Sequence, residues 1–237
     1  MTTILALDDV CFSYGTGFEL RIDSLLLESS EAICLYGPSG CGKSTLLNLI
    51  AGELIAKKGS ISVCGEEMGL FSKEARKAHR IRNIGFVFQD FPLINYLNAL
   101  ENVLLPYRIN PALDLSAFAQ ERARQLLAAF GLQAKEMRRP SQLSQGEQQR
   151  VAIARSLITQ PTLILADEPT AGLDPERSQQ VMDFFLNELS ERSVALVCVT
   201  HDSSVRARFR RCLSFSEDRS DGSFGRFHAI ETEGEHG

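Results

Sequence analysis

Short apolar runs, each bounded by glycine or polar residues, recur along the chain and predict the strands of a sheet. They cover 4–14, 18–28, 32–36, 60–64, 84–88, 163–166 and 194–199. The first two runs flank Gly15-Thr16-Gly17 and contain alternating apolar positions, so they predict a hairpin of an antiparallel sheet. The runs at 32–36 and 163–166 are apolar throughout, which is typical of strands buried in a core.

Helical periodicity fills most of the remaining sequence. It predicts helices at 45–51, 73–82, 98–105, 115–130, 145–158 and 175–189, with a short helix after Asp202. Gly52, Pro106 and Gly131 each stand where a helix is expected to end. From about 90 to 160 the helices follow one another without a strand between them. This predicts a helical lobe inserted in an α/β core.

Together these elements predict an α/β fold in one domain over 1–237. Its expected parts are an α/β core with an antiparallel β subdomain at about 1–89 and 161–215, a helical subdomain at about 90–160, and a polar tail at 216–237 whose residues 231–237 fray. No apolar stretch approaches the roughly 20 residues of a membrane-spanning helix, and the first residues lack a signal-peptide pattern. A membrane role would therefore require a partner protein.

The chain is acidic, with a net charge of −5 and a pI near 5.5. This argues against a nucleic-acid-binding protein, whose surface would carry clustered basic residues. The six cysteines form no C-x-x-C pair, and Cys34 and Cys198 lie inside apolar runs, so reduced structural thiols are expected. Cys41 differs because it stands in a glycine-rich loop, where we expect partial exposure and a reactive thiol.

Residues 37–44, Gly-Pro-Ser-Gly-Cys-Gly-Lys-Ser, match G-x-x-x-x-G-K-[ST] between a predicted strand and a predicted helix, the context in which this motif forms a phosphate-binding loop. Its glycines allow backbone conformations that turn N–H groups toward phosphates, and the following helix directs its positive end at the same anion. Lys43 would reach the β- and γ-phosphates, and the Ser44 hydroxyl would bind Mg²⁺. A glycine-rich turn that matches by chance is the alternative. The residues expected to bind nucleotide here are Gly37, Pro38, Ser39, Gly40, Cys41, Gly42, Lys43, Ser44 and Thr45.

Two adjacent carboxylates, Asp167 and Glu168, follow the apolar run 163–166. The carboxyl end of a strand in such a sheet lies beside the phosphate loop, so both side chains are expected near the nucleotide. Asp167 suits a Mg²⁺ ligand, and Glu168 suits a general base that polarises the attacking water. The alternative is an acidic strand end that faces solvent.

Leu143-Ser144-Gln145-Gly146-Glu147 opens the helix predicted at 145–158, and Ser144 with Glu147 is typical of a capping box. With this segment 23 residues before Asp167, the sequence over about 4–205 resembles the nucleotide-binding subunit of ATP-binding cassette (ABC) transporters. That family has a P-loop NTPase core with an antiparallel β subdomain and an inserted helical subdomain. Its Leu-Ser-Gly-Gly-Gln signature binds the γ-phosphate of ATP held by the opposite subunit, and Ser144, Gly146 and Glu147 occupy matching positions. Gln145 and Glu147 depart from the commonest form, which is expected to affect turnover rate more than function.

The resemblance implies further site residues. Gln89 matches the lid glutamine, which would act in catalysis and reach the Mg²⁺ region, and Asp174, in Ala171-Gly172-Leu173-Asp174, matches the D-loop. His201 matches the switch histidine that contacts the γ-phosphate, and Tyr14 matches the aromatic residue that stacks on adenine. The alternative for Tyr14 is packing at a strand end, and the alternative for His201 is a structural role.

The resemblance also implies how subunits work together. Two subunits, a second copy or a homologous ATPase, would close head to tail around ATP and Mg²⁺ and thereby draw together the helices of a transmembrane permease. Each ATP would lie between Lys43 and Ser44 of one chain and Ser144 and Gly146 of the other. The chain would then be cytoplasmic and peripheral on the inner face of the cell membrane, held there by the permease.

The segments 88–93 and 99–106 resemble the group that powers lipoprotein release, macrolide-type efflux and related envelope export, so export or lipoprotein extrusion is expected. Two alternatives stay open: an ATPase of a small-solute importer of the amino-acid type, and a non-transporting ABC ATPase that transmits force to a cell-envelope partner. A DNA-repair ATPase is disfavoured because the sequence has no heptad insertion, zinc pattern or basic face. A small-molecule kinase has no use for the signature around Ser144 and Gly146.

Overall fold

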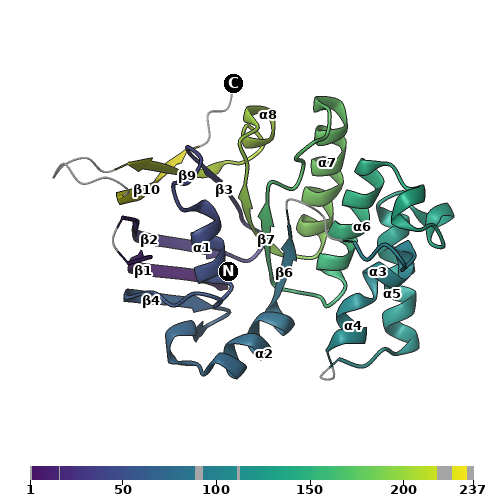
Figure 1. Ribbon diagram of the computed structural model, residues 1–237, viewed down its shortest axis with the longest axis horizontal. Helices are drawn as coiled ribbons and strands as arrows, with labels where there is room; N and C mark the ends of the chain where they lie inside the picture. The colour runs from purple at the N-terminus through teal and green to yellow at the C-terminus, as the bar shows by residue number, and fades with distance from the viewer. Residues whose placement is uncertain (1, 16, 89–92, 111–112, 218–225, 234–237) are drawn as a thin grey trace.

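The computed structural model describes residues 2–15, 17–88, 93–110, 113–217 and 226–233. Helices gather at one side of a long sheet, and α1 and α2 lie along the rest of it (Figure 1). The strands are β1 (Thr3–Ser13), β2 (Glu19–Glu28), β3 (Ala32–Tyr36), β4 (Lys58–Val63), β5 (Glu66–Glu67), β6 (Ile84–Val87), β7 (Leu163–Asp167), β8 (Ala195–Val199), β9 (Arg211–Glu217) and β10 (Arg226–Glu233). The α-helices are α1 (Lys43–Ile50), α2 (Lys73–Asn83), α3 (Ala99–Val103), α4 (Leu105–Ile109), α5 (Ala117–Ala129), α6 (Gln145–Leu157), α7 (Pro175–Glu191) and α8 (Ser203–Arg206), and short 3₁₀ helices cover Met68–Leu70, Gln133–Lys135 and Pro140–Gln142.

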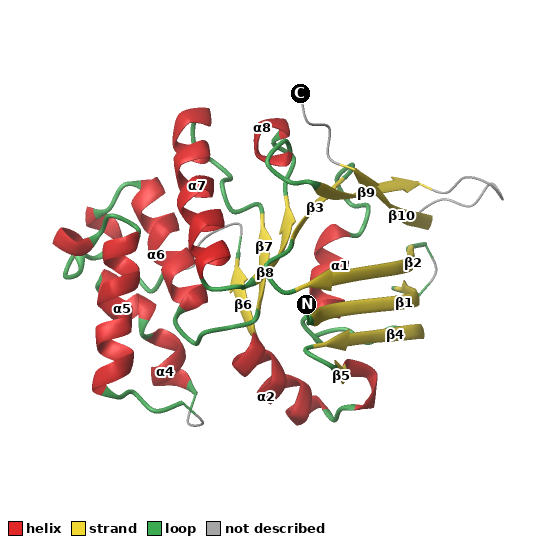
Figure 2. Cartoon of the chain, turned by 180° about the vertical axis from the view of Figure 1, so that it is seen from behind, coloured by secondary structure: helices red, strands yellow, loops and turns green. Residues whose placement is uncertain are grey.

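Within the described residues the strands form one sheet in the order β5-β4-β1-β2-β10-β9-β3-β8-β7-β6. β1 pairs antiparallel with β2 and with β4, as the predicted hairpin requires. At the other end, β3, β8, β7 and β6 are parallel neighbours. Figure 2 shows these two halves of the sheet, the antiparallel half beside α1 and the parallel half between α1 and the large group of helices.

The parallel strands are buried on both faces. On β3, Ile33 and Leu35 belong to a core that also contains α1 and the antiparallel strands, whereas Cys34 belongs to a core shared with α3, α5, α6 and α7. β8 divides its side chains in the same way, because successive side chains of a strand point to opposite faces. The prediction that the continuous apolar runs form buried strands is therefore confirmed.

Polar residues mark where the helices begin. Each cap side chain accepts a backbone N–H from the first turn, which satisfies one of the N–H groups that have no partner inside the helix. The caps are Ser72 for α2, Asn98 for α3, Ser116 for α5, Ser144 for α6 and Asp202 for α8.

The helix predicted at 98–105 is instead two short helices, α3 and α4. Pro106 lies in the first turn of α4 and does not end a helix. Proline is tolerated there because the N–H that it lacks would have no helical partner in the first turn. Pro106 therefore lies at the beginning of a helix, although it was expected to mark the end of one.

Asn102 explains why α3 is firmly placed despite its five residues. Its side chain is fully buried. The amide nitrogen donates to the carbonyls of Ile94, Leu97 and Asn98, and its oxygen accepts the Ile94 N–H at 2.7 Å. One side chain thus satisfies the backbone of the segment that leads into α3.

Described residues within the polar tail predicted at 216–237 form strands, so the expected fraying is wrong for residues 231–233. β9 reaches Glu217, and β10 pairs antiparallel with β9 and parallel with β2. Residues 231–233, expected to fray, belong to β10. The polar composition did not indicate a strand, because this strand is held by backbone hydrogen bonds to its neighbours. β10 lies between β2 and β9 and joins the antiparallel half of the sheet to the parallel half.

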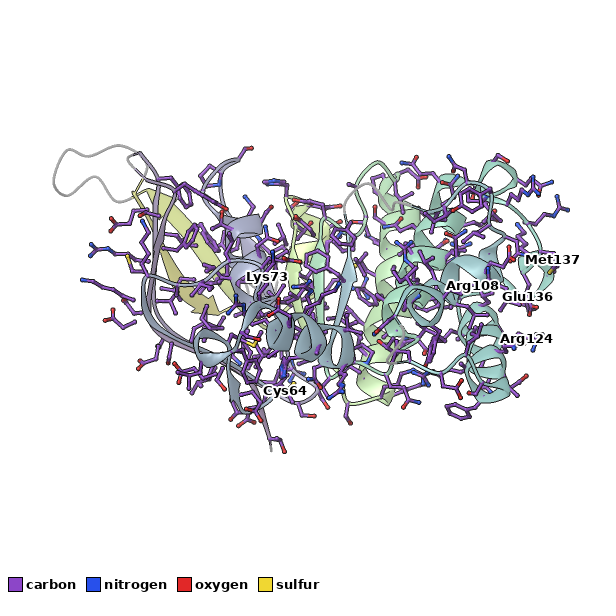
Figure 3. The ribbon with its side chains drawn as sticks, turned by 60° about the horizontal axis from the view of Figure 1, so that its bottom comes forward. Cys64, Lys73, Arg108, Arg124, Glu136 and Met137 are labelled. Atoms are coloured by element: carbon purple, nitrogen blue, oxygen red, sulfur yellow. The ribbon has the colours of Figure 1, made fainter. Side chains whose placement is uncertain are left out.

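Every described element between β6 and β7 is helical, which confirms the predicted run of helices. In Figure 3, Arg108, Arg124, Glu136 and Met137 lie on this helical lobe, far from Cys64. Arg124 lies 3.7 Å from Glu136, so the outer face of the lobe is charged. No described helix is both long enough and apolar enough to cross a membrane.

Candidate functional site

The loop between β3 and α1 has the backbone that a phosphate cradle requires. Gly37, Gly40 and Gly42 have φ angles of +150°, +78° and +104°, a region that residues with a Cβ rarely adopt. A methyl group on Gly37 would lie 2.8 Å from the carbonyl oxygen of Phe215, so neighbouring backbone also excludes a larger residue there. Gly42 is the N-cap of α1, and the positive end of that helix therefore faces the loop.

Lys43 extends back through the loop. Its Nζ donates to the carbonyl oxygens of Gly37 at 2.9 Å and Pro38 at 2.8 Å, and the residue is 6% exposed. These bonds fix the ammonium group at the centre of the cradle. A positive charge held in a glycine-rich loop at the start of a helix is suited to a nucleotide phosphate.

The expectation that Cys41 is partly exposed is wrong. Its side chain is fully buried in the core that contains α1. The Lys43 Nζ lies 3.5 Å from its sulfur on the inner side of the loop. Cys41 therefore packs beneath the cradle and does not line the surface above it.

Ser44 and Asp167 meet although they belong to different elements. The Ser44 hydroxyl, on the first turn of α1, donates to Asp167 Oδ2 at 3.0 Å. Asp167 is the last residue of β7, and β7 lies two strands from β3 in the parallel half of the sheet. The two oxygen-bearing side chains expected to bind Mg²⁺ thus lie side by side.

Glu168 follows at a strained turn, with a φ of +48°. Its N–H donates to Val199 O at 3.0 Å, and its Oε2 accepts the His201 backbone N–H at 3.2 Å. The Glu168 side chain is 14% exposed, and this burial raises the pKa of its carboxyl. The charge of Asp167 also raises this pKa. The His201 backbone N–H, the His201 imidazole and Lys43 act to lower it, but the pKa stays raised. A base with a raised pKa accepts a proton more readily.

One oxygen of Glu168 remains without a hydrogen bond among the described residues. Glu168 Oε1 is buried and accepts no hydrogen bond from the described residues, although His201 Nε2 lies 3.2 Å away. The two groups form an ion pair when the imidazole is protonated. A buried acceptor of this kind can bind a donor brought in by a substrate or by water.

These groups open onto one cavity of about 330 Å³. Tyr14 lies at its rim with its ring half-exposed, in contact with the rings of Phe12 at 4.8 Å and Phe18 at 5.6 Å between centroids. The exposed ring face suits stacking with a planar base. The cavity is lined by Tyr14, Phe18, Ser39, Gly40, Gly42, Lys43, Ser44, Thr45, Asp167, Glu168, Val199 and His201.

Sequence reasoning missed Phe18 and Val199 in this lining. A methyl group on Gly42 would lie 2.8 Å from Phe18 Cζ, so this ring closes the side of the cradle at the start of α1. The aromatic residues flanking the Gly15–Gly17 turn were the available signal for Phe18. Val199 ends β8, and the strand-end position was the signal that could have found it.

The predicted signature residues lie elsewhere in the chain. Ser144 caps α6, its hydroxyl accepts the Glu147 N–H, and Glu147 accepts the Ser144 N–H, which confirms the predicted capping box. Glu147 also accepts a hydrogen bond from Lys135. Burial acts to raise the pKa of Glu147, but the bonds from Lys135 and Ser144 outweigh it, and the pKa is lowered. No residue of this helix start lines the cavity described above.

Two further predicted site residues complete the description. Asp174 precedes α7 and its carbonyl accepts the Ser178 N–H at 2.9 Å, which joins the loop 171–174 to that helix. Gln89 lies outside the described residues.

A glycine cradle between a parallel strand and a helix, with two carboxylates at the neighbouring strand end, defines a P-loop NTPase. The family model described as ABC transporter matches residues 20–171, and the chain belongs to this family. It is an ATP-binding cassette with ATPase activity, as the sequence resemblance implied.

Known proteins of this family are similar over most of the chain. A lipoprotein-releasing system ATP-binding protein, LolD of Hydrogenovibrio crunogenus, is 42% identical over 205 residues, covering 86% of this chain and 84% of its own. The macrolide export ATP-binding/permease protein MacB of Bradyrhizobium diazoefficiens is 37% identical over 90% of this chain and 33% of its own length. The dimeric post-hydrolysis structure of the ATP-binding cassette MJ0796 with ADP and Pi has a TM-score of 0.80 and 32% identity, covering 97% of this chain and 98% of that one.

Proposed function

We propose that this chain binds and hydrolyses ATP with Mg²⁺ in a head-to-tail dimer, and that the dimer powers a transmembrane permease for export or lipoprotein extrusion. One observation carries the proposal. The Ser44 to Asp167 hydrogen bond and the Glu168 to His201 pair open onto the same cavity as the phosphate cradle. Metal ligands, a base and a phosphate-binding loop are thereby within reach of a single nucleotide.

The nucleotide would lie along the cavity from Tyr14 to Lys43. The adenine would stack on the exposed ring of Tyr14, and the backbone N–H groups of Ser39, Gly40 and Gly42, which line the cavity, would hold the phosphates. Lys43 would meet the β- and γ-phosphates as a fixed positive charge, because its bonds to Gly37 and Pro38 hold it there in advance.

The donor chemistry at Ser44 and Asp167 fits Mg²⁺, which prefers hard oxygen ligands and retains several waters. Among the described residues no group of three His, Cys, Asp or Glu side chains could hold a metal ion. Phosphate oxygens and water would therefore complete the coordination, with Gln89 as a further proposed ligand. When bound, Mg²⁺ would neutralise charge that develops on the phosphate oxygens.

Glu168 would orient and polarise the attacking water from the buried end of the cavity. His201, with a side chain that is 56% exposed, would contact the γ-phosphate and hold the Glu168 carboxylate through its backbone N–H. The strained φ of Glu168 supports this role, because strain of this kind is retained where it positions a reacting group.

One chain would supply only half of each working site. Ser144, Gly146 and Glu147 are absent from the cavity lining, so they would act on the ATP of a second subunit, as would Asp174. The similarity of 97% of this chain to the MJ0796 cassette, whose structure is dimeric, supports a dimer. ATP would then favour the closed dimer because it contacts both subunits only in that state.

A second cavity, of about 540 Å³, offers a surface for the permease. It lies between α2 and β6 on one side and α4 on the other, and apolar residues, including Ile81, Phe86 and Ile109, are among those that line it. Lys77, Arg80 and Arg155 stand among its lining residues. A short amphipathic segment on the inner face of a membrane protein would fit a surface that combines apolar and basic side chains. This permease contact would place the chain at the cytoplasmic face of the cell membrane.

The export assignment is supported by the relatives, which are named for lipoprotein release and macrolide export. The test is to express the tagged chain in its own cell and identify the membrane protein that co-purifies. A permease with a large extracytoplasmic domain and ATP-dependent release of lipoprotein from reconstituted vesicles are expected. Recovery of a permease together with a solute-binding protein would indicate the importer alternative. A cell-wall hydrolase regulator without any substrate movement would indicate the force-transmitting one.

A further inference from the structure

Gln145 stands at the first position of α6, where the commonest form of the signature has glycine. Its side chain reaches across to the loop 171–174 that leads into α7. A methyl group built on Gly172 would lie 2.6 Å from Gln145 Nε2 and 3.6 Å from its Cδ. The amide of Gln145 therefore packs directly on the face of Gly172 where any other residue would carry its Cβ.

A second contact lies beside the first. A methyl group on Gly146 would lie 3.8 Å from Leu173 Cδ2, an ordinary van der Waals distance. Consecutive residues of the α6 start thus face consecutive residues of the loop. Helices α6 and α7, which these segments enter, run side by side in both views (Figure 1, Figure 2).

The loop is joined on its other side to Glu168. The Ala171 N–H donates to the Glu168 carbonyl at 3.0 Å, and the Leu173 N–H donates to Thr170 O at 3.2 Å. The backbone that carries the proposed base therefore continues through hydrogen bonds into the loop that Gln145 contacts. Within one subunit, these contacts connect Glu168, which would act on that subunit's ATP, to the start of α6. The start of α6 would in turn meet the ATP of the partner subunit.

Gly172 has a φ of +76°, so this loop holds a conformation that glycine alone adopts without strain. Glycine also gives the unbound loop the greatest backbone freedom, which association would have to restrict. Because the Gln145 side chain packs on Gly172 within one subunit, it already restricts the backbone of the loop. Less backbone freedom is then lost when two subunits associate. Pre-organisation of this kind strengthens association without adding a contact to the partner.

We propose that Gln145 is a positioning residue that holds the 171–174 loop in the shape that docks on the second subunit, and thereby couples the α6 start to Glu168. This rests on the proposed head-to-tail dimer. The contact is one of packing, so its effect depends on the length of the side chain at 145 and does not require an amide.

The test uses the full chain in the Glu168→Gln background, with the dimer dissociation constant measured by sedimentation at saturating ATP. Gln145→Gly should raise that constant about 3- to 30-fold, the usual range for residues that couple two sites. The ATP affinity of the monomer should be unchanged, because residue 145 does not line the nucleotide cavity. Gln145→Met, which keeps an unbranched chain of similar length, should restore the dissociation constant to within about twofold of the parent.

Gln120→Gly is the matched control, because Gln120 is an exposed glutamine at the fourth position of α5. Its replacement by glycine also carries the cost of placing glycine in a helix. Equal dimer constants for Gln145→Gly and its parent, or a Gln145→Met variant as weak as Gln145→Gly, would overturn the proposal. A Glu168→Gln parent that stays monomeric with ATP would instead contradict the proposed dimer. The two failures are therefore distinguishable.

Discussion

The Ser44 hydroxyl donates a 3.0 Å hydrogen bond to Asp167, a residue 123 positions further along the chain. This hydrogen bond joins the first turn of the helix after the phosphate loop to the end of β7. This pairing places a hydroxyl and a carboxylate where a divalent cation can bridge them to phosphate oxygens.

Asp167→Asn should test the charge in that pair. Asparagine retains an oxygen that can accept the Ser44 hydrogen bond but removes the negative charge that would attract Mg²⁺. ATP hydrolysis should fall about 10²- to 10³-fold, and the Mg²⁺ concentration for half-maximal rate should rise. Steady-state rates across a Mg²⁺ titration measure both effects. Asp114→Asn, an exposed change outside the cavity, is the control, and an unchanged Mg²⁺ dependence in Asp167→Asn would contradict the assignment.

Glu168→Gln should separate binding from hydrolysis. The amide keeps the size of the side chain but cannot take a proton from water, so turnover should fall about 10²- to 10⁴-fold. ATP binding should persist, because Lys43 and the loop are untouched. Single-turnover rates and equilibrium binding of ATP measure the two quantities. A variant that hydrolyses ATP at the parent rate would remove Glu168 from the role of base.

The same substitution should also change how stability depends on pH. Burial raises the pKa of the Glu168 carboxyl, with the nearby Asp167 charge adding to this, against the opposing His201 N–H, imidazole and Lys43. The folded chain therefore binds this proton more tightly than the unfolded chain. The free energy of unfolding should fall as pH rises from about 4.3, where an unfolded glutamate titrates, through the higher folded value.

Glutamine at 168 is neutral at every pH and avoids this loss. Glu168→Gln should thus unfold at a higher temperature than the parent near neutral pH, and the difference should vanish near the unfolded pKa. Calorimetry at a series of pH values measures it. A difference that stays constant between acidic and neutral pH would show that the carboxylate is not destabilised by burial.

Tyr14 should contribute to affinity through its ring alone. Tyr14→Ala should raise the dissociation constant for ATP about 5- to 100-fold, in line with the loss of one base-stacking contact. Tyr14→Phe should stay near the parent, because the ring that stacks is kept. Equilibrium titration with a fluorescent ATP analogue checks this order. Equal affinities for Tyr14→Ala and Tyr14→Phe would indicate that the ring only packs on Phe12 and Phe18.

Asn102 should matter for stability far more than its polarity suggests. Asn102→Ala would leave the Ile94 N–H and the Leu97 carbonyl without their partner, at a cost of about 3 kcal/mol in the free energy of unfolding. Asn187→Ala, at an exposed position of α7, should change it by less than about 0.5 kcal/mol. Urea denaturation of both variants gives the comparison, and equal stabilities would contradict the role of Asn102.

Much of the fold could be predicted because the signals were local. The apolar runs of β3, β7 and β8 and the cap at Ser144 depend on neighbours in sequence, and each lies within one or two residues of the predicted place. β10 could not be found in this way. Its position depends on the edges of β2 and β9, which come from distant parts of the chain.

The candidate site shows the same division. The phosphate loop follows from its motif, whereas the burial of Cys41 depends on how α1 packs against the antiparallel strands. Phe18 entered the cavity lining without a motif to mark it. The packing of Gln145 on Gly172 joins the signature at 143–147 to the loop 171–174. These two motifs are separate in the sequence, so their contact could be found only from the structure.

The central claim is that one ATP is held by the phosphate loop of one subunit and by the α6 start of another. It is tested most directly by mixing two Glu168→Gln chains, one carrying Ser39→Cys and the other Ser144→Cys, with a short bifunctional thiol reagent. We predict a covalent dimer that contains both chains, forms only with ATP, and is lost when either added cysteine is omitted. A mixture that gives no cross-linked pair with ATP, or the same yield without it, would contradict the claim.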